Sequence, residues 1–177
     1  RIADICNANN VTLCSDEIHC DLILEEGKQH IPAGREVNLA DNSVTLMAAS
    51  KTFNIAGLGT SFAIIPNRQL RQSFTNAAAG IVPWVTVLGL AATEAAFTQC
   101  DDWHQAQIAY LRENRDMVFN TINSIDGLRM LKADATFLAW VDASGLGVEN
   151  VQQWAQEKGV GPSPGIDFHK ADHFRIN

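Results

Sequence analysis

The chain has 177 residues, of which 46% are hydrophobic and 19% are charged, and its formal net charge is −7. This composition is typical of a packed globular interior and excludes an intrinsically disordered chain. The negative charge and the lack of a basic cluster argue against nucleic acid and anionic membranes as partners, and no apolar run approaches the roughly 20 residues of a membrane-spanning helix.

Short apolar segments alternate with helical patterns in the first part of the chain. We predict one helix followed by three strands there, at about residues 1–9, 11–15, 44–48 and 61–65. Apolar runs without strict alternation favour an α/β fold, in which a mostly parallel sheet has helices on both faces. Residues 25–42 contain two glycines and a proline, and we expect them to form an excursion over the surface.

Two polar residues follow two of these predicted strands directly. Asp16 comes after the first strand and Lys51 comes shortly after the second. Ligands of such sheets bind beyond the carboxyl ends of the strands. We therefore expect Asp16 and Lys51 to face the same crevice.

The later part of the chain is predicted to be richer in helix. A helix is expected to begin near Arg68, and a second one, at 84–97, is rich in Ala, Leu and Val and is predicted to be buried on most sides. A long helix runs from Asp101 towards the stop signal Asp126-Gly127. Beyond it we predict an α+β module. Its three short strands are expected at 128–131, 136–141 and 174–176, and its one helix at 148–158.

The four cysteines have no spacing typical of a metal site or a redox motif. They lie in or beside segments predicted as helix or strand, at Cys6, Cys14, Cys20 and Cys100. We expect them to be small buried side chains in a reducing compartment, the cytoplasm, rather than disulfide partners or metal ligands. The histidines at 104, 169 and 173 have no metal-ligand spacing either, and they are predicted to lie at the surface.

The residues around Lys51 point to covalent chemistry. A solvated loop lysine stays protonated, whereas a lysine in a partly dry pocket can lose its proton and attack a carbonyl. Residues 50–57 read Ser-Lys-Thr-Phe-Asn-Ile-Ala-Gly, and residues 16–19 read Asp-Glu-Ile-His. Together the two segments resemble the pyridoxal-phosphate enzymes of the class I/II aminotransferase superfamily, and most closely its branch of cystathionine beta-lyase-like carbon–sulfur lyases.

The resemblance extends over essentially the whole chain and implies its organisation. Residues 1–103 would be part of the cofactor-binding large domain, and 104–177 would be a bridging helix and an incomplete small α+β domain. It also implies a homodimer, and a fragment that lacks an N-terminal segment and the last helix of a longer enzyme. Because the family's phosphate loop lies in that N-terminal segment, we expect the chain alone to hold pyridoxal phosphate poorly.

The resemblance also assigns roles to the residues of the two motifs. Lys51 would be the catalytic lysine that bonds to the cofactor aldehyde and moves the proton of the substrate Cα. Asp16 would keep the pyridine nitrogen protonated, because a nearby anion stabilises the cationic ring. Ile18 would pack on the ring face, and Ser50 would help to hold the phosphate. His19 could donate to the cofactor's phenolic oxygen, or instead pair with Glu17 or a backbone carbonyl.

Two further positions bear on the substrate. Arg175, in the sequence Phe-Arg-Ile-Asn at 174–177, matches the arginine that binds the substrate α-carboxylate, a task suited to the forked guanidinium. The alternative is an arginine on an edge strand. Gly59 stands where aminotransferases often have a phosphate-binding arginine, which favours the lyase branch. His30, in the surface excursion, is expected near the entrance of the active site.

The function implied by the resemblance is a carbon–sulfur β-lyase that releases a thiol, pyruvate and ammonia from cystathionine or a related cysteine conjugate. One alternative is a pyridoxal-phosphate-dependent class I/II aminotransferase, and in both cases the expected partner is a small-molecule amino-acid substrate. A second alternative is a non-catalytic regulatory module that binds the cofactor without turnover and follows a DNA-binding domain.

Overall fold

The computed structural model describes residues 1–35 and 39–177, and it has a mixed α/β architecture. The chain divides into two compact units, the first made of residues 1–21 and 29–104 and the second of 22–28 and 105–177. The elements up to the long helix are α1 (Ile2–Ala8), β1 (Leu13–Asp16), β2 (Ser43–Met47), β3 (Phe62–Ile64), α2 (Arg68–Ala78), α3 (Val87–Gln99) and α4 (Asp101–Asn123). Those after it are β4 (Arg129–Met130), β5 (Ala139–Asp142), α5 (Val151–Glu157), β6 (Ser163–Pro164) and β7 (His173–Ile176).

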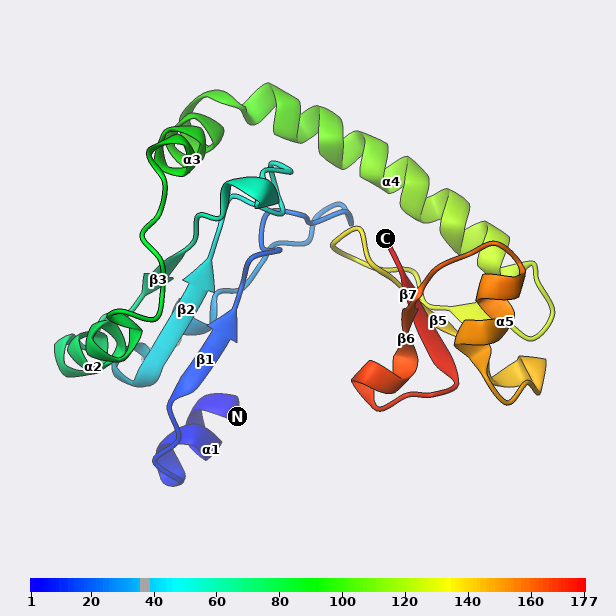
Figure 1. The fold of residues 1–177 in the computed structure, drawn as a ribbon, viewed down its shortest axis with the longest axis horizontal. Helices are drawn as coiled ribbons and strands as arrows, with labels where there is room; N and C mark the ends of the chain where they lie inside the picture. The colour runs from blue at the N-terminus through cyan, green and yellow to red at the C-terminus, as the bar shows by residue number, and fades with distance from the viewer. Residues whose placement is uncertain (36–38) are drawn as a thin grey trace. The chain divides into compact units, whose positions relative to one another are not determined.

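The first unit is built on a three-stranded sheet in the order β1-β2-β3. β1 and β2 run parallel, with Leu13 opposite Ser43 and Asp16 opposite Leu46, and Figure 1 shows their arrows side by side and pointing the same way. β3 is antiparallel to β2. The expected parallel arrangement therefore holds for β1 and β2 but not for β3, because the connection from β2 to β3, residues 48–61, contains the 3₁₀ turn Ala56–Leu58 but no crossover α-helix.

Helix α3 differs from the sequence prediction. Residues 84–97 were expected to be buried on most sides, but Val87 and Leu88 are 80% and 73% exposed, and within α3 only Gly89 and Ala96 are buried. The helix begins at Val87 because the Thr86 side chain caps it, accepting the N–H of Gly89 at 3.0 Å. Apolar side chains lie on all sides of this helix, so its sequence does not indicate which side packs. Among the described residues, α3 buries Gly89 and Ala96 and packs the Phe97 ring against Phe53 and Phe62.

The second unit has its own sheet and its own core. All its strand pairs are antiparallel, in the order β4-β5-β7-β6. β6 was not predicted, since a pair of residues in a segment rich in Gly and Pro gives no strand pattern. The core is formed by buried side chains from α4, the sheet and α5, namely Ile122, Leu128, Met130, Ala139, Val141, Ala143, Val151 and Phe174.

The cysteines are all free. Cys6 is buried and Cys20 and Cys100 are half-buried, but the expectation of burial is wrong for Cys14, which is exposed because alternate side chains of β1 face outward. Burial, together with the charge of Asp21, raises the pKa of the Cys20 thiol to about 11. Cys20 is therefore held as an unreactive thiol.

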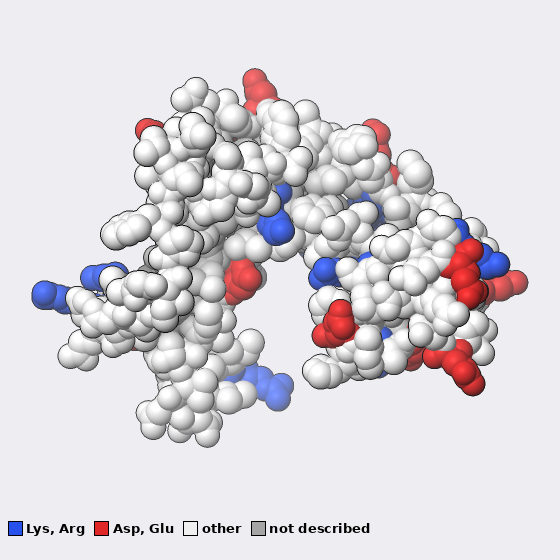
Figure 2. Space-filling view, viewed as in Figure 1, with Lys and Arg blue, Asp and Glu red and all other residues white. Residues whose placement is uncertain are grey.

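The surface of the described residues carries charges of both signs. Figure 2 shows lysine, arginine, aspartate and glutamate side chains scattered over the visible face, most of which is uncharged. No helix in the described part of the chain is long and apolar enough to cross a membrane.

A tight turn ahead of β7 requires glycine at position 165. A Cβ atom on Gly165 would overlap the carbonyl oxygens of Lys170 and His173. The turn is closed by the N–H of Lys170, which donates to the Gly165 carbonyl at 2.9 Å, and His169 adopts the left-handed conformation with φ of 59°.

We predict that Gly165→Ala lowers the free energy of unfolding by about 2–3 kcal/mol, because backbone atoms must move to admit the methyl group. The measurement is urea unfolding followed by circular dichroism. Gly161→Ala is the matched control, since a Cβ at Gly161 meets nothing within 4 Å. Equal stability of the two variants would contradict the prediction.

Candidate functional site

Asp16 is the last residue of β1 and its carboxylate is exposed. One carboxylate oxygen, Oδ1, accepts the N–H of Ile18 at 3.3 Å, which fixes the side chain against the turn that follows. The backbone of the next residue continues the parallel ladder, because the N–H of Glu17 donates to the Leu46 carbonyl at 2.9 Å. Backbone hydrogen bonds to β2 therefore fix the position of Asp16 at the end of β1.

Lys51 lies in the turn that leaves β2 at the same end of the sheet. The turn is closed by two backbone hydrogen bonds, from Phe53 to Ala49 at 2.9 Å and from Ile55 to Ser50 at 3.1 Å. The Lys51 side chain is half-buried, and its amine makes no hydrogen bond or ion pair with another described residue. Because β1 and β2 are parallel, Asp16 and the Lys51 turn both extend from the carboxyl edge of the strands.

The side chains of Thr52 and Phe53 pack this turn against the rest of the first unit. Thr52 is 1% exposed, and its Oγ1 is buried without a hydrogen-bond partner among the described residues. The Phe53 ring lies 5.6 Å from that of Phe97 in an edge-on arrangement and 6.2 Å from that of Trp103 in a stacked one. Such ring pairs stabilise packing beyond area burial alone. This cluster was missed in the sequence, where only the periodicity of helices α3 and α4 could have suggested it.

His104 is also part of the Phe53 cluster, with ring centroids 5.8 Å apart. It was predicted to lie at the surface, but it is half-buried and its Nε2 is 2.8 Å from the Asp21 carbonyl oxygen. The prediction failed because the Asp21 carbonyl is far away in sequence and leaves no local pattern.

Glu17 is a buried carboxylate that follows Asp16 directly. It is 5% exposed, and its two oxygens contact the His30 Nε2 at 2.6 Å and the Ala33 N–H at 2.9 Å. Burial raises the pKa of Glu17, but the hydrogen bonds from His30, Ala33 and Ser15 outweigh it and hold the pKa below its ordinary value. His30 is thus bound to the β1 end through Glu17, and His19 is half-buried beside this segment of chain.

Arg175 lies on β7 in the second unit. β7 pairs with β5 on one side and β6 on the other, so Arg175 is opposite Trp140 and Ser163 and is not on an edge strand. Its Nη2 lies 3.5 Å from the Ser163 hydroxyl, its Cζ lies 4.8 Å from the centre of the Phe168 ring, and its Nε is buried without a partner among the described residues. Asp16, Ile18, His19, Ser50 and Lys51 belong to the first unit, whereas Arg175 belongs to the second.

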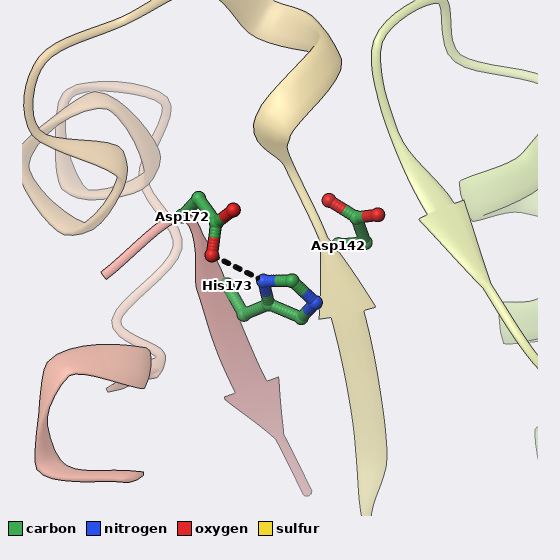
Figure 3. A group of neighbouring side chains, drawn as sticks. All are labelled: Asp142, Asp172 and His173. Atoms are coloured by element: carbon green, nitrogen blue, oxygen red, sulfur yellow. Dashed lines mark hydrogen bonds and ion pairs between the residues drawn. The ribbon is translucent and has the colours of Figure 1, made fainter. Parts of the chain in front are cut away.

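Three polar side chains gather at the start of β7. The Nδ1 of His173 lies 2.7 Å from Asp172, and Asp142, opposite His173 in the sheet, accepts the Ser144 N–H at 2.9 Å (Figure 3). His173 was predicted at the surface, yet only 14% of its side chain is exposed. Hydrogen bonds within the protein account for this arrangement, and no metal role follows from it.

The family model for aminotransferases of class I and II matches residues 1–177, which is the whole chain. The chain belongs to the class I and II aminotransferase family. This confirms the resemblance seen in the sequence around Asp16 and Lys51.

Individual members of this family are similar over nearly the whole chain. The cystathionine beta-lyase PatB of Bacillus subtilis is 36% identical over 168 residues, which are 90% of this chain and 42% of PatB. A crystal structure of OvoB superposes with a TM-score of 0.96 at 46% identity and covers 98% of this chain and 46% of OvoB. Cystalysin of Treponema denticola, whose structure contains pyridoxal 5'-phosphate, has a TM-score of 0.91 at 31% identity, with 99% of this chain and 46% of that one covered. The chain thus spans less than half the length of these family members.

The buried Glu17 makes the stability of this family member depend on pH. Its folded-state pKa is lowered below the ordinary 4.5, so its contribution is present above that pH and is lost as the pH falls through the folded pKa. We predict that Glu17→Gln lowers the free energy of unfolding by about 2 kcal/mol at pH 7, because charged hydrogen bonds are lost. The difference from the wild type should shrink as the pH falls below the ordinary pKa of 4.5 and through the lowered folded-state pKa.

Urea unfolding of both proteins across this pH range is the measurement. Glu94→Gln is the control, because Glu94 is exposed on α3. A difference between wild type and Glu17→Gln that stays constant down to acidic pH would show that the carboxylate charge contributes nothing.

Proposed function

We propose that the complete protein is a pyridoxal-phosphate-dependent carbon–sulfur β-lyase that acts on cystathionine or a related cysteine conjugate. The observation that supports it most directly is the parallel pairing of β1 with β2, which brings Asp16 and the Lys51 turn to one edge of the sheet. An acid and an amine beyond the carboxyl ends of adjacent parallel strands are placed where α/β proteins bind ligands. The names of family members such as PatB support the lyase reaction.

The residues at this edge fit pyridoxal phosphate chemically. The exposed carboxylate of Asp16 keeps Oδ2 free of hydrogen bonds to other described residues, so it can accept the pyridinium N–H. The Lys51 amine, half-buried and unpaired among the described residues, is available to hold the aldehyde. Ser50 is half-buried beside it and would donate to the phosphate, Ile18 would contact the ring, and His19 is the candidate donor to the phenolic oxygen.

Each residue of the site has a defined task in the proposed reaction. When bound, pyridoxal phosphate supplies an electron sink for the negative charge that develops at the substrate Cα. Asp16 holds the ring proton by its negative charge. With substrate bound, the Nζ of Lys51 takes the proton from Cα, and the thiol then leaves from Cβ. One water molecule is consumed when the remaining fragment is hydrolysed to pyruvate and ammonia.

Arg175 is the proposed site for the substrate α-carboxylate. A guanidinium offers parallel N–H donors that match the two carboxylate oxygens. In this proposal, residues 1–103 are part of the cofactor-binding large domain, and 104–177 are the bridging helix and small domain that brings Arg175 to the substrate. We also propose a homodimer, and a cytoplasmic location, which the four free cysteines support.

The assay for this function measures products of the complete enzyme with cystathionine. Release of pyruvate, ammonia and thiol without an added keto acid is expected for the lyase. Amino transfer to a keto acid without pyruvate or thiol would identify an aminotransferase instead, and cofactor binding without turnover of either kind would identify a regulatory module.

We predict that Lys51→Ala lowers kcat of the complete enzyme by about 10⁴-fold or more, because proton transfer and covalent attachment are both lost. Borohydride reduction should then fix no pyridoxal phosphate to the protein. The exposed Lys158 supplies the control variant Lys158→Ala, with wild-type kcat expected. Retention of borohydride-fixed cofactor in Lys51→Ala would exclude Lys51 as the attachment site.

For Asp16→Asn we expect a decrease in kcat of about 10²- to 10³-fold, since a neutral amide does not stabilise the protonated ring in the transition state. The variant should still be labelled by borohydride at Lys51. Asp126→Asn, at an exposed position, is the control. Steady-state kinetics with cystathionine tests this role, which an unchanged kcat in Asp16→Asn would refute.

A further inference from the structure

Two aromatic rings support the guanidinium of Arg175. The Phe168 ring lies under it, with 4.8 Å between Cζ and the ring centre, which is within the range of cation–π attraction. Trp140 meets Phe168 edge-on, at 5.4 Å between ring centres and an interplanar angle of 82°. Phe168 therefore contacts both Trp140 and Arg175, and the aromatic stack consists of the Phe168 ring and the Arg175 guanidinium.

The backbone around the stack is fixed at both ends. Trp140 and Arg175 are direct partners across β5 and β7. Phe168 ends the 3₁₀ turn Gly165–Phe168, which is closed by the hydrogen bond from the Lys170 N–H to the Gly165 carbonyl at 2.9 Å, and the His173 N–H at the start of β7 donates to the Lys170 carbonyl at 3.0 Å. Since Gly165 leaves no space for a side chain, this turn has little freedom to move. The position of the Phe168 ring is thus set by the fold.

No acid holds Arg175 in place within the described residues. The ion pairs found there leave Arg175 out, and its one hydrogen bond is the long contact to Ser163 at 3.5 Å. Its Nε is buried and has no hydrogen-bond partner in the part of the chain that the structure describes. The Phe168 ring attracts the guanidinium without accepting a conventional hydrogen bond from it. The aromatic stack thus orients the fork without using up the donors that a carboxylate needs.

We infer that Phe168 is a positioning residue for substrate binding: it orients Arg175 for the α-carboxylate, and Trp140 packs edge-on against the Phe168 ring. The inference rests on the proposed function in assigning the carboxylate to Arg175. Orienting the side chain before binding lowers the entropy cost of binding. Loss of the ring should therefore weaken carboxylate binding while leaving the proton transfer at Lys51 unchanged.

The test uses the complete enzyme and the variants Phe168→Leu and Phe168→Tyr. Phe168 is 44% exposed, so both substitutions are compatible with folding. Phe168→Leu should raise KM for cystathionine about fivefold to twentyfold, with kcat within about twofold of wild type. Phe168→Tyr retains an aromatic ring and should restore the wild-type KM. The matched control is Ile166→Ala, in the same turn and 61% exposed.

A second measurement does not depend on turnover. Propionate carries a carboxylate but no amine, and its Kd for the enzyme, measured by calorimetry, should rise in Phe168→Leu by the same factor as KM. In the Arg175→Lys background the effect of Phe168→Leu should vanish, because the oriented fork is already gone.

Three outcomes would overturn the inference. They are an unchanged propionate Kd in Phe168→Leu, a failure of Phe168→Tyr to restore it, and an effect of equal size in the Arg175→Lys background. Failure of the proposed function has a different signature, because the wild-type enzyme would then release no thiol or pyruvate while the propionate titration still reports on the Phe168–Arg175 pair.

Discussion

The parallel pairing of β1 with β2 is the constraint on which the candidate site depends. Four residue pairs, from Leu13 with Ser43 to Asp16 with Leu46, set the register, and the hydrogen bond from Glu17 to the Leu46 carbonyl extends it by one residue. A shift by one residue would turn the exposed Asp16 inward and the buried Glu17 outward. Both errors are costly, because one charge would be buried and another would lose its partners. The register thus fixes the acid that the proposed chemistry needs.

The second unit positions Arg175 by a different kind of contact. Its core lies between α4, the sheet and α5, and Arg175 projects from β7, a strand paired on both sides. In the first unit, the buried carboxylate of Glu17 is satisfied by hydrogen bonds, whereas the Arg175 guanidinium lies against the Phe168 ring. A polar group held by apolar contacts keeps its donors for a ligand, which suits the substrate-binding role proposed for Arg175.

The sequence allowed the strands of the first unit and the turn with Lys51 to be predicted, because short apolar runs and a distinctive motif are local signals. It did not reveal the pair between Glu17 and His30, nor the stack of Phe168 on Arg175, because these contacts depend on how turns return to the sheet. The sequence also did not predict that α3 is exposed, because a helix with apolar residues on all sides does not indicate which side is buried. The roles of Asp16, Ile18, His19, Ser50, Lys51 and Arg175 remain predictions of the family resemblance.

The two edge strands of the second sheet are short, which affects how readily the sheet can pair with a strand of another molecule. β4 and β6, at its two borders, are Arg129–Met130 and Ser163–Pro164. Proline has no amide hydrogen to donate, and an edge strand of two residues offers few backbone hydrogen bonds to a strand of another molecule. Short edge strands of this kind disfavour the growth of a β-sheet between two molecules.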